Sequence, residues 1–311
     1  MKLASVQAFV EVVKAGSIHA AARQLGLSQP ALSKSLRALE EDLAAPLLTR
    51  SSYGVELTTY GKVFYQRAQV VIDELRKGRE DVTQLRGPFE GRLTVSIAPA
   101  STMQLAPMAI VDFCRECPDV ELHIEEGIWP VVSESLRDGS IDIAIGPMRD
   151  EHPPAEVVFE RLLDVQMAIV LRPGHPLAGA TSLRELVGGR WLHQGVGGSG
   201  SASILTKRIF ADHDLPVPAV SVESRSLTAT IMMLQRMDLI AVMPRRILDL
   251  PGVRDALAIV DLKETLGSNL IGLIYRGDRP LTRLAQIFAK HTRRAAAHLA
   301  RERNQGEESR S

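Results

Sequence analysis

Apolar residues near the N-terminus recur at helical spacing. Between residues 28 and 43, leucines stand three or four positions apart, which predicts one buried helical face: Leu32, Leu36, Leu39 and Leu43. Ser28 precedes this helix as a candidate N-cap, because its hydroxyl oxygen can accept a hydrogen bond from a free backbone amide. Pro30 falls in the first turn, where a missing N–H costs little. The opposite face carries amide, hydroxyl and cationic side chains: Gln29, Ser33, Lys34 and Arg37.

A shorter helix is expected just before this one. Ser17 is its candidate cap, three alanines in a row allow close helix packing, and Gly26 supplies the turn, so residues 17–37 form a helix-turn-helix. The chain has 37 basic and 37 acidic residues, yet the segment from Gly16 to Arg37 holds three cations and no acid. Such groups pair with phosphates and base edges. Double-stranded DNA is the predicted partner; the alternative is an ordinary helical hairpin with a solvated polar face.

The segment that follows predicts a hairpin and then a long helix. Residues 45–58 are rich in Pro, Ser, Gly and β-branched residues, which favours two strands with a tip at residues 51–54. Thr58 can cap a helix that reaches about Leu85. Its apolar positions are separated by four and three residues in turn, a heptad seam that favours pairing with a second helix and hence a dimer: Phe64, Ala68, Val71, Leu75, Gly78, Val82 and Leu85. The alternative is that this seam packs on its own domain.

Beyond Gly87, Pro88 and Gly91, short β-rich runs alternate with helical patterns. Strands are expected at 93–98, 120–124, 141–145, 165–171, 191–194, 220–223, 239–243 and 270–275. Helices are expected at 107–114, 129–136, 203–213, 227–235 and 281–300. This alternation predicts βαβ units and a parallel sheet. The polar tail, residues 301–311, is expected to be disordered.

Small and polar residues follow several of these strands. In open α/β folds, ligands bind beyond the carboxyl ends of strands, near helix N-termini. The candidate effector contacts are therefore Ala100, Ser101, Thr102, Gly146, Pro147, Gln194, Ser199, Ser201 and Met243. The loop GVGGSGS precedes a helix and can present free amides to an anion. Its alternative role is a flexible connector.

Several motifs together resemble LysR-type transcriptional regulators. The matching segments are residues 3–9, the runs AARQL and SQPALS, residues 39–40, residues 46–50 and residues 57–61, and later SLRDGSIDIAIG and RPGHPL. The resemblance implies an all-α winged helix-turn-helix at 1–58 and a linker helix with a hinge at 59–90. An α/β effector-binding domain at 91–300 would follow, with two Rossmann-like subdomains of periplasmic-binding-protein type. One subdomain would comprise 91–163 and 268–300, and the other 164–267.

The resemblance also implies roles for particular residues. Arg50 would lie on the wing and contact phosphate or the minor groove; its alternative is an exposed strand charge. The linker helix would form a homodimer, and a homotetramer is expected. A small-molecule effector would bind between the subdomains, although Ala100 stands at the usual hydroxyl position. The runs EGIWPVVSESLRDGSIDIAIGP and QLRGPFEG are similar to regulators of aromatic sulfonate and aromatic acid catabolism, which implies an aromatic or small organic anion. Activation and repression both stay open.

Composition and motifs argue against a membrane protein, a secreted protein, a zinc protein and an enzyme. No run of about 18 apolar residues suggests a membrane span, and the N-terminus reads as an amphipathic helix rather than a signal peptide, so we expect a cytoplasmic protein. Cys114 and Cys117 lack the further ligands of a zinc site, which leaves inert thiols or a redox sensor. We find no catalytic, metal or cofactor motif and expect no enzyme. A receptor without DNA function, an enzyme and a sequence-independent nucleoid protein are the competing classes.

Overall fold

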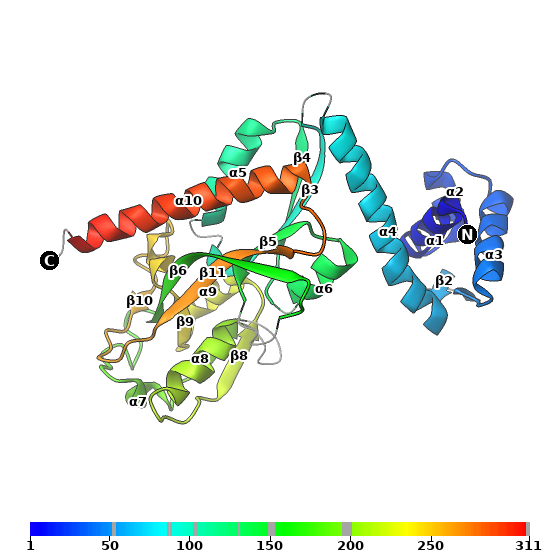
Figure 1. Ribbon diagram of the computed structural model, residues 1–311. Coiled ribbons are helices and arrows are strands. Elements are labelled where there is room, and N and C mark those ends of the chain that lie inside the picture. The colour runs from blue at the N-terminus through cyan, green and yellow to red at the C-terminus, as the bar shows by residue number, and fades with distance from the viewer. Residues whose placement is uncertain are drawn as a thin grey trace. The chain divides into compact units, whose positions relative to one another are not determined.

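The computed structural model describes residues 1–51, 54–85, 87, 89–101, 105–129, 131–148, 153–194 and 201–308. It divides into two compact units (Figure 1). The first comprises residues 1–87 and 137–140, and the second residues 88–136 and 141–311. Each unit is described by itself.

The first unit is a three-helix core with a hairpin and a long helix. Its elements are α1 (Leu3–Ala15), α2 (Ile18–Gln24), α3 (Gln29–Leu43), β1 (Leu48–Ser51), β2 (Gly54–Leu57) and α4 (Thr59–Gln84). The apolar stripe of α3 is buried as predicted: Leu32, Leu36 and Leu39 are each at most 5% exposed. They share a core with Phe9 of α1, whose ring centroid lies 5.6 Å from that of Phe64 on α4.

The predicted heptad seam of α4 divides into two parts. Phe64 and Ala68 pack into the core of the first unit, so this part of the seam serves its own domain. Val71, Leu75, Val82 and Leu85 are 44–77% exposed. The first stretch of the seam therefore packs on its own domain, and the pairing of the exposed stretch with a second helix stays a prediction.

The second unit contains a seven-stranded mixed sheet. Strands β3 (Gly91–Ile97), β4 (Val120–Glu126) and β5 (Ile143–Pro147) are parallel, as predicted. Strands β6 (Val157–Leu171) and β11 (Ser268–Arg276) run antiparallel to each other, and β11 is antiparallel to β5. The predicted parallel βαβ units are confirmed for β3, β4 and β5, and the antiparallel pairing of β11 was not predicted. The first half of β6 was not predicted because charged residues such as Glu160 and Asp164 break its apolar pattern.

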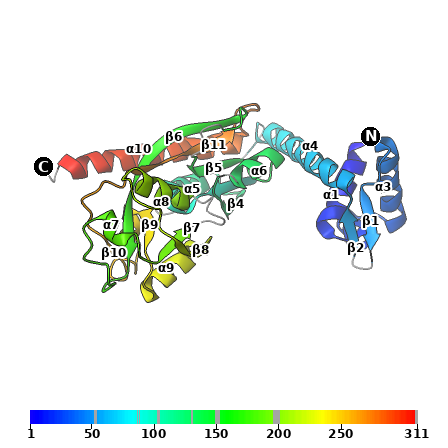
Figure 2. The same cartoon turned by 90° about the horizontal axis from the view of Figure 1, so that it is seen from below.

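Strands β6 and β11 join the two halves of the second unit. Toward its end, β6 pairs with β9 (Ala241–Pro244) and β10 (Ala258–Ile259). Parallel strands β7 (Trp191–Gln194) and β8 (Val220–Ser224) form a small separate sheet. Helices α7 (Leu183–Leu186), α8 (Ser201–Ala211) and α9 (Leu227–Arg236) belong to this half, and 3-10 helix η2 spans Arg245–Asp249. Figure 2 shows the pairing of β7 with β8 and α9 beside them.

The other half carries 3-10 helix η1 (Pro99–Ser101), α5 (Leu105–Glu116), α6 (Val131–Asp138) and α10 (Arg283–Glu308). Helix α10 packs on α5, where the rings of Phe113 and Phe288 meet edge to face at 5.5 Å. The helix runs on through Glu308, whereas the sequence suggested a disordered tail from residue 301. A polar contact of 3.2 Å between His298 Nε2 and Glu302 Oε1, one turn apart, supports the extra turns. Residues 309–311 lie outside the described part of the chain.

Both cysteines of the CxxC pair are free thiols at the end of α5. Cys114 is exposed, whereas Cys117 is buried in the main core. Burial raises the pKa of the Cys117 thiol to about 11, which disfavours the reactive thiolate. Among the helices in the described ranges, none combines the length and apolar character that a bilayer span requires.

Candidate nucleic-acid interface and ligand site

The second helix of the helix-turn-helix is built as its sequence predicts. Ser28 caps α3, and its Oγ accepts a hydrogen bond of 3.3 Å from the amide of Ala31. Pro30 lies in the first turn. Burial of the leucine stripe turns the other face outward: Gln29, Pro30, Lys34 and Arg37 are exposed and Ser33 is half-buried. Among the described residues, neither Lys34 nor Arg37 is engaged in an ion pair, so both cationic groups are available to a polyanion.

The hairpin beside α3 has the expected wing geometry in its backbone. Strands β1 and β2 are antiparallel, with Arg50 opposite Val55 and Ser51 opposite Gly54. Residues 52–53 at the predicted tip and the side chain of Arg50 lie outside what the structure describes. The proposed DNA contact of Arg50 therefore stays a prediction.

A carboxylate at the end of α3 fixes the root of this wing. Oε1 of Glu40 accepts hydrogen bonds from the backbone amides of Leu47 at 2.7 Å and Leu48 at 3.1 Å. The amide of Val55 donates to the carbonyl of Gly16 at 3.0 Å, which ties β2 to the turn between α1 and α2. Sequence reasoning did not assign Glu40 this role. The available signal was that Glu40 is the first of three consecutive acids at the end of α3, six residues before a proline.

The start of α4 holds the other end of the wing. The Oγ1 of Thr58 accepts from the amide of Gly61 at 2.9 Å, which confirms the predicted cap, and donates to the carbonyl of Pro46 at 2.6 Å. Gly61 stands against the carbonyl of Leu47 so closely that a β-carbon would overlap it. The contacts of Glu40, Thr58 and Gly61 thus connect α3, the wing and α4 at the segment that leads into β1.

In the second unit, two candidate effector contacts have buried polar atoms without partners. Ser101 closes η1 after β3 and is 2% exposed. Gln194 ends β7 and is half-buried. Among the described residues, neither Ser101 Oγ nor Gln194 Nε2 has a hydrogen-bond partner. Buried polar atoms usually have partners, so these two atoms favour a polar ligand at the carboxyl ends of the strands.

The other candidate contacts have different surroundings. Gly146 and Pro147 are buried in β5, and a β-carbon on Gly146 would approach that of Ala98 to 2.8 Å, so close packing accounts for this glycine. Met243 is fully buried in the core around Leu192 and Leu234. The backbones of Ala100 in η1 and Ser201 at the start of α8 are described, but their side chains are not. Thr102, Ser199 and the glycine-rich loop at 195–200 lie outside the described residues.

One histidine lies beside these candidates. His193 precedes Gln194 on β7 and is 2% exposed. Burial lowers the pKa of His193, so it is held neutral near pH 7. Within the described ranges, no group of three or more His, Cys, Asp or Glu side chains is placed to hold a metal ion.

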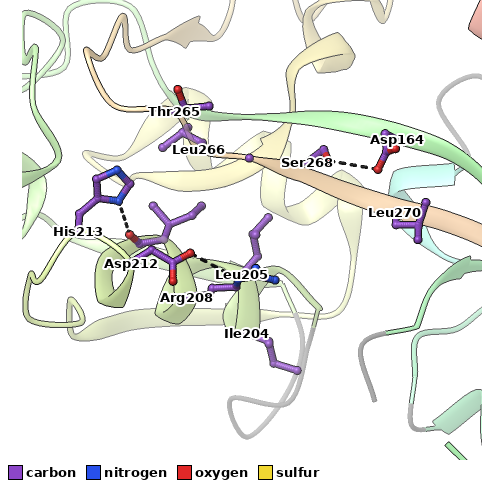
Figure 3. Close-up of a pocket in the computed structure, with 12 residues that line it drawn as sticks. Asp164, Ile204, Leu205, Arg208, Asp212, His213, Thr265, Leu266, Ser268 and Leu270 are labelled. Carbon is purple, nitrogen blue, oxygen red and sulfur yellow. Dashed lines mark hydrogen bonds and ion pairs between the residues drawn. The ribbon is translucent and has the colours of Figure 1, made fainter. Parts of the chain in front are cut away.

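A cavity of about 760 Å³ lies between α8 and the strands that join the two halves (Figure 3). Its lining residues come from β6, from α8 and the residues after it, and from the segment that enters β11. Of the candidate effector contacts whose side chains the structure describes, none is among them. Sequence reasoning missed this cavity because its walls come from three segments that the pattern does not connect.

Two family models match the chain. The model described as "Bacterial regulatory helix-turn-helix protein, lysR family" matches residues 3–62, and the "LysR substrate binding domain" matches residues 86–297. The second match begins at residue 86, next to the boundary between the structural units at residue 87, and residues 63–85 lie between the two matches.

Individual proteins agree with this assignment. The chain is 27% identical over 288 residues to the HTH-type transcriptional regulator GbpR of Azospirillum brasilense, covering 91% of this chain and 83% of GbpR. It is 30% identical over 177 residues to the SDS degradation transcriptional activation protein of Pseudomonas sp., covering 57% of this chain and 58% of that protein. The solved structure of full-length CbnR complexed with its target DNA superposes with a TM-score of 0.70 at 20% identity, covering 95% of this chain and 100% of CbnR. At that identity the likeness concerns the fold alone.

Proposed function

The chain belongs to the LysR family of transcriptional regulators, and we propose that it reads a near-palindromic operator as a dimer or tetramer under the control of a small-molecule effector. The proposal places the protein in the cytoplasm as a regulator rather than an enzyme. The proposal covers both activation and repression of transcription.

The exposed face of α3 carries the DNA-binding proposal. Gln29 can bond the edge of adenine, Arg37 can bond guanine, and Lys34 can reach phosphate. The leucine stripe fixes this face outward, because turning it inward would bury the charges. The CbnR structure, named for a complex with DNA, supports the same use of the fold.

The exposed part of α4 carries the dimer proposal. Val71, Leu75, Val82 and Leu85 form an apolar edge for which a second copy of the helix is the natural cover. Two copies of α3 could then read two half-sites set apart by whole turns of DNA. Exposed Val111 on α5 and Ile124 on edge strand β4 offer a second surface for a tetramer.

Replacing Val71 and Leu75 together by glutamate should yield monomers in analytical ultracentrifugation and abolish operator binding. Persistence of the dimer would remove this interface from the account.

Ser101 and Gln194 carry the effector proposal. Gln194 Nε2 is a donor and the Ser101 hydroxyl can donate, so a ligand oxygen suits both. A small organic anion, aromatic or not, fits that requirement. SDS, in the name of one relative, is itself an organic anion. A thermal-shift screen with organic acids should give a hit whose stabilisation is lost in Ser101→Ala. Equal stabilisation of the variant would place the ligand elsewhere.

The DNA-binding proposal is tested by fluorescence anisotropy on a duplex that the wild-type protein selects. Arg37→Ala should weaken specific binding by roughly 5- to 150-fold, the cost of about 1–3 kcal/mol for a lost bidentate base contact. Arg236→Ala on α9 removes the same charge from the second unit and should leave the affinity unchanged. Equal affinities for both variants would contradict a recognition role for α3. Binding that disappears at moderate salt on every sequence would favour a nucleoid protein or a receptor without operator function.

A further inference from the structure

An exposed leucine stands at the turn between the two helices of the helix-turn-helix. Leu27 lies between Gly26 and the α3 cap Ser28, and 47% of its surface is exposed. Leu25, on the other side of Gly26, packs against the core of the first unit. Burial in that core accounts for Leu25 and leaves about half of Leu27 in solvent.

The backbone holds Leu27 in a fixed position. Its amide donates to the carbonyl of Ala22 at 2.9 Å, and the amide of Gly26 donates to the carbonyl of Arg23 at 3.3 Å. With Gly26 at a φ of +64°, these hydrogen bonds form the Schellman motif that ends α2. The apolar residue after the glycine commonly packs on the last turn of the helix, but that turn presents Ala21 and Ala22, which offer only methyl groups. The motif therefore orders Leu27 and covers only part of its side chain.

Leu27 is continuous with the face of α3 that is proposed to read DNA. Residues 26–31 are all exposed, and they include Gln29, one of the proposed base contacts. In helix-turn-helix proteins, the N-terminal residues of the second helix contact base edges in the major groove. Because Leu27 stands two residues before Gln29, its side chain enters the same part of the groove. We therefore expect DNA bases to cover the exposed half of Leu27.

A leucine side chain matches only one group in the major groove. Base edges there present hydrogen-bond donors, acceptors and the 5-methyl group of thymine. Leucine placed against a donor or an acceptor displaces its water without replacing the hydrogen bond, which is unfavourable. Leucine placed against the methyl group removes apolar surface from water on both sides, which is favourable.

We propose that Leu27 reads the 5-methyl group of a thymine in each half-site of the operator. This inference rests on the proposed reading of DNA through α3 and adds a specificity-determining contact to it. A leucine without any contact in the complex is the alternative, since isolated apolar residues are common on protein surfaces. The two interpretations differ in one measurable respect, because only the first makes the affinity depend on the methyl group.

The test replaces thymine by deoxyuracil, which removes the methyl group and keeps the hydrogen-bonding groups of the base. Fluorescence anisotropy measures binding of the full-length protein to the duplex that it selects, with each symmetry-related pair of thymines replaced in turn. Replacement of one pair should weaken wild-type binding by about 15-fold, or about fourfold for each half-site, the factor expected for one methyl-sized group returned to water. In Leu27→Ala, the same replacement should change the affinity by less than about twofold.

Two further variants separate the contact from a general effect on the domain. Leu27→Met keeps an apolar side chain of similar volume and should keep a penalty of at least about fivefold for the same pair. Val63→Ala removes an exposed apolar side chain of α4 and should keep the full penalty. The four combinations of base and side chain at position 27 form a cycle that isolates the coupling between leucine and the methyl group.

A penalty that is present in the wild-type protein, Leu27→Met and Val63→Ala and absent in Leu27→Ala supports the proposal. Wild-type binding that is insensitive to every thymine replacement overturns it without any variant. A penalty that persists in Leu27→Ala also overturns it, because another residue or the shape of the DNA then senses the methyl group. Loss of operator binding in Arg37→Ala would still support reading by α3 in either case, whereas a protein that selects no sequence would overturn both proposals.

Discussion

Removal of the Glu40 carboxylate should release the root of the wing while leaving α3 intact. Glu40→Ala deletes both acceptor contacts, to the amides of Leu47 and Leu48. A hydrogen bond to a charged group contributes about 1.5–3 kcal/mol, and because Glu40 is only half-buried the lower figure applies to each. The loss for both is then about 3 kcal/mol, or roughly 150-fold in the equilibrium for local opening.

Hydrogen exchange followed by mass spectrometry measures this opening directly. Peptides covering residues 46–51 should exchange faster in Glu40→Ala by that factor, whereas α3 peptides should change little. The hairpin itself persists because the β1–β2 ladder, the Val55–Gly16 hydrogen bond and the Thr58 contacts remain. Operator affinity should fall, since a displaced wing no longer aligns with the recognition helix.

Glu41→Ala is the matched control. It removes the same charge from the next position, which is exposed and makes no side-chain hydrogen bond or ion pair with any described residue. Exchange at 46–51 that is equal in the two variants would refute the reasoning, because it would mean that other contacts hold the wing. Faster exchange throughout the first unit would instead indicate that Glu40 supports the whole domain.

Three further predictions follow from local geometry. Gly61→Ala should destabilise the first unit by about 2 kcal/mol or more, because its β-carbon would overlap the carbonyl of Leu47. Gly78→Ala, whose β-carbon would meet nothing within 4 Å, should stabilise α4 by up to about 1 kcal/mol. Thermal unfolding checks both variants, and a less stable Gly78→Ala would indicate a close helix crossing in the dimer. A maleimide at pH 7 should modify Cys114 alone in the folded protein and both cysteines after denaturation, and equal native labelling would contradict the raised pKa of about 11 for Cys117. Burial lowers the pKa of His175 and His193, so the unfolded chain binds protons first as pH falls through about 6.5, and the melting temperature should fall from pH 7.5 to 5.5. Carboxylates with lowered pKa, such as Glu116 beside Lys290, reduce the stability of the fold only below about pH 4.5. The melting temperature of the double variant His175→Gln, His193→Gln should therefore not change between pH 7.5 and 5.5, which would identify the two histidines as the source.

Local pattern was enough for most of the first unit. The leucine stripe, the Ser28 cap and the Thr58 cap each depend on residues within a few positions, and all three are confirmed. The role of Glu40 was missed because its partners lie seven and eight residues away, across a turn. The division of the α4 seam into a buried and an exposed stretch could not be predicted from local pattern either. It depends on the position of Phe9 of α1, which packs against the first seam residues.

The second unit shows where sequence reasoning ends. Element positions followed from periodicity, but the direction of β11 against β5 and β6 depends on pairing over more than a hundred residues. Met243 ends a predicted strand and Ser101 follows another. The thioether of Met243 is in the core, whereas the hydroxyl of Ser101 is buried with no hydrogen-bond partner among the described residues. Strand-end position selects candidates, and only packing separates a core side chain from one available to a ligand.

The central claim is that this chain reads a specific DNA sequence through a paired α3. The most direct measurement is selection of binding duplexes from a random pool by the full-length protein at physiological salt. The account predicts enrichment of a sequence with dyad symmetry whose half-sites are about one or more whole helical turns apart. The enrichment should disappear with Arg37→Ala. Retention of DNA without any enriched sequence, or of a single half-site without symmetry, would contradict it.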